Sequence, residues 1–202
     1  MDPLKFAGIE MPQVGGDVVA DAGALLASYG KHATWRHVQG VAEVCVQLAQ
    51  RFGLDETACR LAGILHDISA VIAPKDMLRF AQEAGMALDP AEERYPFLLH
   101  QRLSAVVAQL HFGIDDSAVT EAIACHTTLR AQAGDVDMAL FLADKIAWDQ
   151  PGEPPFLSEV NAALDVSLRH ACRVYIDYVM DNGMILMPHR DLLAAREWLK
   201  QC

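Results

Sequence analysis

Cysteine is sparse in this 202-residue chain, and none of it forms a C-x-x-C pair. An odd number of widely spaced cysteines argues against a disulfide scaffold and favours a reducing compartment. Residues 1–10 lack the basic and apolar regions of a signal peptide, and no uncharged apolar run approaches the ~18 residues of a membrane span. These absences predict a cytoplasmic protein. The cysteines are Cys45, Cys59, Cys125, Cys172 and Cys202.

Basic side chains are also scarce, since 16 lysines and arginines against 27 aspartates and glutamates leave a formal net charge of −11. A general nucleic-acid binder needs basic stripes to displace counterions, so this charge argues against nucleic-acid partners. It equally disfavours docking onto an anionic membrane. A small phosphate ester would need local cations to attract it against the overall field.

Alternating strand patterns and sequence repeats are absent, and the dominant hydrophobic period is helical. Residues 34–52 place apolar side chains three and four positions apart on one face. Gly53 suits the left-handed position after that helix, and Asp55 suits the N-cap of the next one. In the same way, Gly113 is predicted to end one helix and Asp115 to start the next. The pattern predicts an all-α fold.

Proline-rich stretches divide the rest of the chain. Residues 87–96 predict a connection with at most a short helical turn, and Asp149–Pro155 is the strongest helix breaker. Long amphipathic helices are predicted over Phe156–Asp181 and His189–Lys200, and both need a core to pack on. We therefore predict that all 202 residues form one compact multi-helix domain. Its core would cover about residues 33–181, with an N-terminal helix and a C-terminal closing helix.

A histidine and an aspartate stand side by side in the apolar run "LAGILHDISAVI" (residues 61–72). A buried carboxylate is costly unless a cation or several donors satisfy it, so Asp67 must pair with a structural partner or with a metal. A lone histidine on an apolar face is usually a core residue. Here, however, five apolar segments each carry an imidazole, a carboxylate or both, which favours a metal site. These residues are His37, His66, Asp67, His100, His126 and Asp144.

Neutral imidazole together with carboxylate suits first-row metals such as iron, manganese or zinc. Thiolates are missing from the set, which argues against a structural zinc finger. Four imidazoles and two carboxylates exceed the needs of one tetrahedral ion, whereas two ions roughly 4 Å apart would use all six. We predict Asp67 as the bridge between such ions and, with His66, as the centre of catalysis.

Five short motifs, in this order along the chain, resemble those of a known family. Three of them resemble the HD superfamily of metal-dependent phosphohydrolases, and "LLH" and "CHTT" resemble its YqeK-type members, the symmetrical bis(5'-nucleosyl)-tetraphosphatases. The resemblance covers roughly residues 33–198. The motifs are "RHVQGVAEV", "GILHD", "LLH", "CHTT" and "FLADKI".

This resemblance implies a compact all-helical HD-domain fold and two metal ions, iron or another first-row metal such as manganese. It also implies hydrolysis of a nucleotide phosphoanhydride, with diadenosine tetraphosphate cleaved to two ADP by attack of metal-bound water. The first ion would be held by His37, His66, Asp67 and Asp144, and the second by Asp67, His100 and His126.

An anionic substrate in so acidic a chain needs cations besides the metal. Four residues beside the predicted ligands are candidate substrate contacts: Arg102, Thr127, Arg130 and Lys145. Solvated surface charges, or a turn cap in the case of Thr127, are the plainer roles. Trp148 and Phe156 flank the proline-rich loop, where they either stack on a nucleobase or simply pack.

Two departures from the family pattern keep other functions open. Ala70 stands where many members have lysine, and Leu129 replaces the glycine after "HTT". They favour, as one alternative, a regulatory module that binds a nucleotide or a metal without turnover. A di-iron oxygenase is the other alternative, because related helical HD scaffolds can run redox chemistry. The abundance of apolar helix faces is compatible with a homodimer.

Overall fold

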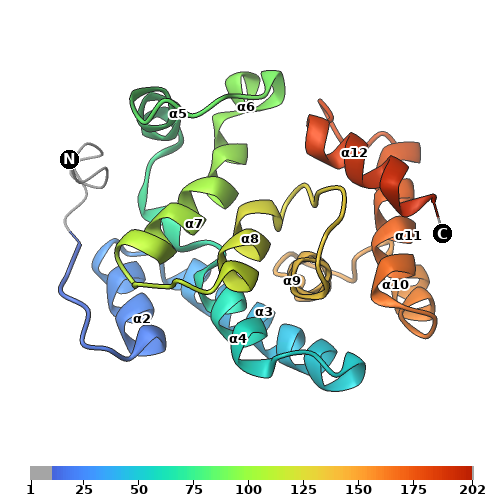
Figure 1. Ribbon diagram of the computed structural model, residues 1–202, viewed down its shortest axis with the longest axis horizontal. Coiled ribbons are helices and arrows are strands. Elements are labelled where there is room, and N and C mark those ends of the chain that lie inside the picture. The colour runs from blue at the N-terminus through green and yellow to red at the C-terminus, as the bar shows by residue number, and fades with distance from the viewer. Residues whose placement is uncertain (1–10, 202) are drawn as a thin grey trace.

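The computed structural model describes residues 11–201, and over that range it contains eleven α-helices, two 3-10 helices and no strand (Figure 1). The predicted all-α class is therefore confirmed. The expectation that residues 1–10 carry no signal lies outside the described residues, as does Cys202. The helices are α2 (Val18–Ser28), α3 (His32–Phe52), α4 (Glu56–Leu65), η1 (Ile68–Val71), α5 (Pro74–Glu83), α6 (Pro90–Arg94), η2 (Pro96–Leu99), α7 (His100–Leu110), α8 (Ser117–Cys125), α9 (Asp135–Ile146), α10 (Leu157–Leu164), α11 (Leu168–Asp181) and α12 (Arg190–Leu199).

The residues that end α3 and start α4 are those predicted from the sequence. Gly53 ends α3 with a left-handed φ of 69°, and its backbone N–H donates to Ala49. The Asp55 side chain then accepts from the backbone of Thr57 and Ala58, which caps the first turn of α4. This tight connection makes α3 and α4 antiparallel neighbours that pack along their length.

Two helix boundaries differ from the predictions. Asp116, not Asp115, caps α8, because its side chain accepts from the backbone N–H of Ala118. The predicted helix over Phe156–Asp181 is two helices, since α10 ends at Leu164. Ser167 there adopts an extended conformation, and its side chain accepts from the backbone of His170. A serine N-cap inside an apolar pattern therefore starts a second helix.

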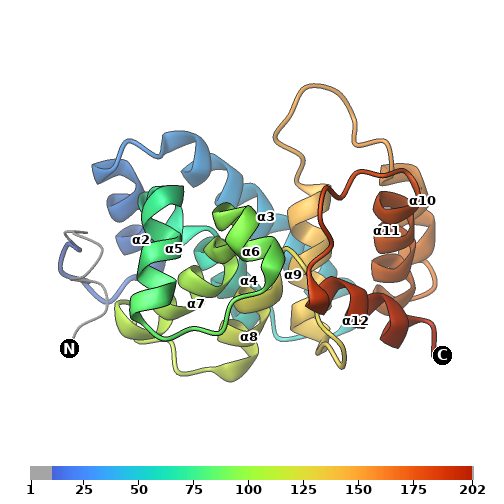
Figure 2. The ribbon, with the colours of Figure 1, turned by 90° about the horizontal axis from the view of Figure 1, so that it is seen from above.

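Helix α9 lies between the two ends of the molecule (Figures 1 and 2). It packs against α3, α8 and α11, and residues 137–143 along it are all buried. The buried apolar residues form one core that extends from α2 to α12, which favours the predicted single domain. The connection from α9 to α10 loops out at the top of Figure 2. Within residues 11–201, none of the helices combines the length and apolar character needed to cross a bilayer.

The crossing of α3 and α4 depends on Gly63. A Cβ atom added there would lie 2.5 Å from the Ala42 Cα and 2.9 Å from its nitrogen, which is closer than backbone atoms allow. We expect Gly63→Ala to force α4 away from α3 and to lower the free energy of unfolding by about 3 kcal/mol. Thermal unfolding measures this effect. Gly40→Ala is the matched control, because an added Cβ at this α3 position meets nothing within 4 Å. An unchanged melting temperature in Gly63→Ala would contradict the expectation.

Candidate metal centre

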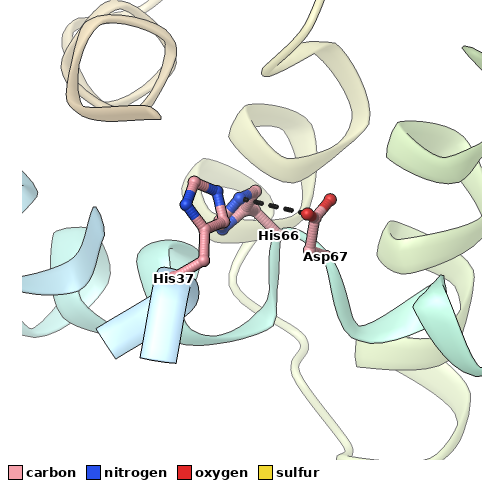
Figure 3. Close-up of side chains that lie close together, drawn as sticks. All are labelled: His37, His66 and Asp67. Atoms are coloured by element: carbon pink, nitrogen blue, oxygen red, sulfur yellow. Dashed lines mark ion pairs between the residues drawn. The ribbon is translucent and has the colours of Figure 1, made fainter. Parts of the chain in front are cut away.

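The predicted ligands converge because most of them stand at helix ends. His66 follows the last residue of α4, Asp67 precedes η1, and His126 follows α8. His66 and His126 are 0% and 1% exposed, whereas the Asp67 side chain is 26% exposed. Figure 3 shows His37 projecting from α3 toward His66 and Asp67. His100 opens α7, and Asp144 stands in the last turn of α9.

Three of the imidazoles are fixed in one tautomer by the backbone. In each, Nδ1 lies within hydrogen-bond distance of the carbonyl oxygen three residues earlier, and a carbonyl only accepts. Nδ1 therefore carries the proton, and in the neutral ring Nε2 presents its lone pair, as a metal ligand requires. The distances are 2.8 Å for His66 to Gly63, 2.6 Å for His100 to Phe97 and 2.8 Å for His126 to Ile123.

The ligand atoms form two groups that share Asp67. In the first, the atoms of His37, His66 and Asp67 lie within 4.8 Å of one another, and in the second so do those of Asp67, His100 and His126. Asp144 adjoins the first group, because its Oδ1 lies 3.1 Å from the His37 Nε2 and 3.5 Å from the His66 Nε2. We call these six residues the cluster.

Two features of the cluster fit metal ions. The buried Nε2 of His66 has no hydrogen-bond partner among the described residues. The Nε2 atoms of His100 and His126 lie only 2.9 Å apart. Since both rings are protonated on Nδ1, two lone pairs face each other at that distance unless a cation or a proton lies with them. The residues present therefore suit a metal ion in either group.

The charged groups of the cluster shift one another's pKa values. Burial opposes ionisation of Asp67, but the neighbouring imidazoles of His66 and His100 hold its pKa below the usual range. Lys145 and His37 overcome the same burial at Asp144 and hold its pKa well below that range. Burial also disfavours a charged His66, yet Asp67 and Asp144 raise its pKa to about 9. The carboxylates of Asp67 and Asp144 thus stay ionised and attract positive charge.

A cleft of about 320 Å³ opens on the cluster, and we call it the cluster cleft. His37, Asp67 and Asp144 form its floor. The loop after α9 and helix α11 also line the cleft, with Trp148, Asp149, Gln150, Phe156 and Tyr175. The Trp148 and Phe156 rings meet edge to face at 6.1 Å, so the proline-rich loop is part of the site wall.

The predicted substrate contacts are divided between the cluster and distant ion pairs. The Lys145 Nζ lies 2.5 Å from the Asp144 Oδ2 and lines the cluster cleft, and the Thr127 hydroxyl lies 3.1 Å from the His100 Nε2. The structure does not bring Arg102 and Arg130 to the cluster. Carboxylates hold both guanidinium groups elsewhere, from Glu92 for Arg102 and from Asp137 and Glu121 for Arg130.

Leu129 adopts a backbone conformation that usually belongs to glycine. Its φ is +57°, just after the His126 turn, and its side chain is fully buried. A left-handed conformation costs a non-glycine residue roughly 1–2 kcal/mol, whereas burying a leucine contributes about 2–3 kcal/mol. Burial of the side chain therefore offsets the strain, and the turn that presents His126 forms without glycine.

Asp149 is a residue of the site that the sequence analysis missed. The buried Nδ1 of His37 has no hydrogen-bond partner among the described residues, unlike the Nδ1 atoms of the other three cluster histidines. The Asp149 Oδ2 lies 3.9 Å from it, on a side chain that is 62% exposed and can rotate. A carboxylate behind a ligating histidine fixes the ring and strengthens the ligand. No short motif marks Asp149, since it lies in an irregular loop.

We expect Asp149→Ala to weaken metal binding about tenfold, toward the lower end of the range for such outer partners. Calorimetric titration of the metal-free protein with Mn²⁺ measures the affinity. Asp149→Asn should retain part of it, because the amide oxygen still accepts from the His37 Nδ1–H. Glu153→Ala is the control, since it removes an exposed carboxylate from the same loop. Equal affinities of all three variants would rule out this role.

Comparison with known proteins identifies the family. The model of the HD domain matches residues 34–149. An "Uncharacterized protein in pepC 5'region" of Lactococcus lactis subsp. cremoris is 37% identical over 140 residues, 69% of this chain and 71% of that protein. A protein of Halalkalibacterium halodurans named symmetrical bis(5'-nucleosyl)-tetraphosphatase is 31% identical over 166 residues, 80% of this chain and 86% of that protein.

A solved structure extends the similarity to nearly the whole chain. It is described as a predicted HD superfamily hydrolase involved in NAD metabolism from Clostridium acetobutylicum. The TM-score is 0.79 at 26% sequence identity, and the match covers 94% of this chain and 98% of that one. With the family model matched over more than half of its length, this chain belongs to the HD-domain family of hydrolases.

Proposed function

We propose that this protein is a phosphohydrolase with two metal ions that cleaves nucleotide phosphoanhydrides, with diadenosine tetraphosphate to two ADP as the best candidate reaction. The observation that carries the proposal is the pair of ligand groups sharing Asp67. The relative from Halalkalibacterium halodurans, named for symmetrical tetraphosphatase activity, supports the substrate class. Imidazole and carboxylate ligands support iron, with manganese or another first-row metal as the alternative.

Ions bound in the two groups would polarise a phosphoryl oxygen and lower the pKa of water to near neutrality. The chain's own residues prepare the site. The backbone carbonyls of Gly63, Phe97 and Ile123 orient three imidazoles before any ligand arrives. Lys145 lies against Asp144 and adds positive charge beside the floor of the cluster cleft, where a substrate phosphate would lie. Such preorganised charge is worth most where charge develops during the reaction.

The test combines metal analysis of anaerobically purified protein with product analysis on diadenosine tetraphosphate. Near two metal ions per chain and ADP as the sole product would support the proposal. Tight nucleotide binding without turnover, with metal supplied, would favour the regulatory module instead. Oxygen consumption without phosphatase activity would favour a di-iron oxygenase. A protein that holds no metal and hydrolyses no phosphoanhydride with iron, manganese or cobalt would refute both the phosphohydrolase and the di-iron oxygenase.

A further inference from the structure

A second cleft, of about 480 Å³, adjoins the cluster cleft along α3, and we call it the α3 groove. The two clefts share four lining residues: Ala33, His37, Trp148 and Asp149. They are therefore adjacent, with His37 and the Trp148 indole between them. A ligand whose phosphates reach the cluster can extend into the α3 groove.

The floor of the α3 groove contains a glycine that packing does not require. Gly40 lies in the middle of the 21-residue helix α3, where glycine costs about 1 kcal/mol relative to alanine. An added Cβ would meet nothing within 4 Å, in contrast to Gly63, where the neighbouring backbone excludes it. The missing side chain leaves the groove open along the helix.

Arg36 supplies an unpaired cation at the end of the α3 groove next to the cluster. Most described lysines and arginines are held by a carboxylate, a carbonyl or an aromatic ring. Of the cations without any such contact, Arg36 alone lines either of the two clefts, and it precedes His37 in the chain. In a chain with a net charge of −11, a free guanidinium beside the cluster is the side chain best suited to an incoming phosphate. The unpaired cations in the described part of the chain are Lys31, Arg36, Arg60 and Lys75.

Glu43 places a negative charge in the α3 groove, away from the positive charge of Arg36. It lies seven residues after Arg36 on the same face of α3, about 10 Å further along the helix axis. A carboxylate repels phosphate but accepts hydrogen bonds from the amino group of a nucleobase. Five apolar residues also line the groove. They are Ala33, Val44, Ile146, Ala147 and Trp148.

We infer that the α3 groove binds the nucleoside half of a dinucleoside polyphosphate that lies beyond the bond cleaved at the cluster. Arg36 contacts the phosphate of that half, the apolar residues contact its base, and Glu43 accepts from the amino-bearing edge of the base. Asp149, the remaining acidic residue of the groove, faces His37 instead. This inference rests on the proposed function, because it takes the cluster as the place of cleavage.

The test is calorimetric titration of Mn²⁺-loaded protein with ADP, alongside activity on diadenosine tetraphosphate. Arg36→Gln and Gly40→Leu should each raise the Kd for ADP at least tenfold, because the first removes the phosphate contact and the second fills the groove. Glu43→Gln should reduce the preference for ADP over uridine diphosphate, whose base carries no amino group. The matched controls are Arg60→Gln, an exposed and unpaired arginine outside both clefts, and Gln39→Leu, an exposed α3 residue outside both clefts.

The outcomes separate this inference from the proposed function. If the wild type hydrolyses the dinucleotide but Arg36→Gln and Gly40→Leu bind ADP with unchanged affinity, the α3 groove does not bind the nucleoside half. The proposed phosphohydrolase activity would then still stand. If the wild type binds ADP without hydrolysing the dinucleotide, and the two variants lose ADP binding, the α3 groove remains a nucleotide site. The proposed phosphohydrolase activity would then be wrong. No ADP binding by the metal-loaded wild type would overturn the groove. Circular dichroism of each variant shows whether α3 remains folded.

Discussion

Asp67→Ala is expected to abolish binding at both proposed metal sites and to lower the proposed phosphohydrolase activity more than 100-fold. Asp67 is the one residue that the two ligand groups have in common within residues 11–201. Its Oδ1 lies 3.4 Å from the His100 Nε2 and 3.7 Å from the His126 Nε2, and its Oδ2 lies 3.8 Å from the His66 Nε2. Loss of an outer partner alone costs about 10–100-fold in affinity or activity, so loss of a ligand from both groups should exceed that.

Metal content per chain is the primary measurement, since it does not depend on choosing the right substrate. Asp115→Ala, which removes an exposed aspartate after Gly113, is the control and should retain wild-type metal and activity. Asp67→Asn preserves the shape of the side chain and separates loss of the ligand charge from local unfolding. Two ions retained in Asp67→Ala would show that Asp67 is not the bridge.

The sequence predicted the cluster because its residues are ionisable side chains within or beside apolar segments. His66 and Asp67 interrupt an apolar run, and so does Asp144. Burying such groups is costly without a partner, so apolar context alone indicates that they meet. The structure brings the six together: five form the two ligand groups, Asp144 contacts His37 and His66, and His66 is fully buried. Their role as ligands stays a prediction that metal analysis tests.

The second layer of the site could not be predicted in the same way. Asp149 faces His37 only because the irregular loop after α9 folds back over α3, and no hydrophobic period specifies that path. The positions of Arg102 and Arg130 next to ligands in the chain indicated substrate contacts. Their guanidinium groups instead pair with carboxylates 10 and 7 residues away, a choice that depends on tertiary packing. Apolar context in the sequence thus predicted which residues form the cluster, whereas adjacency in the sequence did not predict what surrounds it.

Glu92→Ala is expected to lower the free energy of unfolding by about 3 kcal/mol, at the low end for loss of one partner from a buried ion pair. Glu92 is fully buried, and both of its carboxylate oxygens accept from the Arg102 Nη1, at 3.1 and 3.0 Å. It also accepts from the Asp89 backbone and lies 3.7 Å from the Nε2 of His189, which caps α12. The variant leaves Arg102 partly buried without a carboxylate partner, with only the Ala87 carbonyl still accepting from it, and it removes a link between α6, α7 and α12. Urea unfolding measures the loss.

Glu93→Ala is the matched control, because it removes an exposed carboxylate from the next position of α6. Its unfolding free energy should stay within about 0.5 kcal/mol of wild type, as surface substitutions usually do. If both variants lose the same amount, the effect arises from helix α6 itself and the buried network contributes nothing.

Acid should remove the Glu92 contribution in a defined range of pH. Burial disfavours its charge, but the nearby His189 imidazole and the hydrogen bonds from the Asp89 backbone and Arg102 lower its pKa from 4.5 to about 2. As pH falls below about 5, the unfolded chain therefore binds the proton before the folded chain does, and stability falls. The contribution, up to about 3 kcal/mol, is complete above that pH and lost on approach to pH 2. In metal-free protein, the difference in unfolding free energy between wild type and Glu92→Gln should shrink across this range. A difference that stays constant down to pH 3 would show that the carboxylate is not held ionised by its partners.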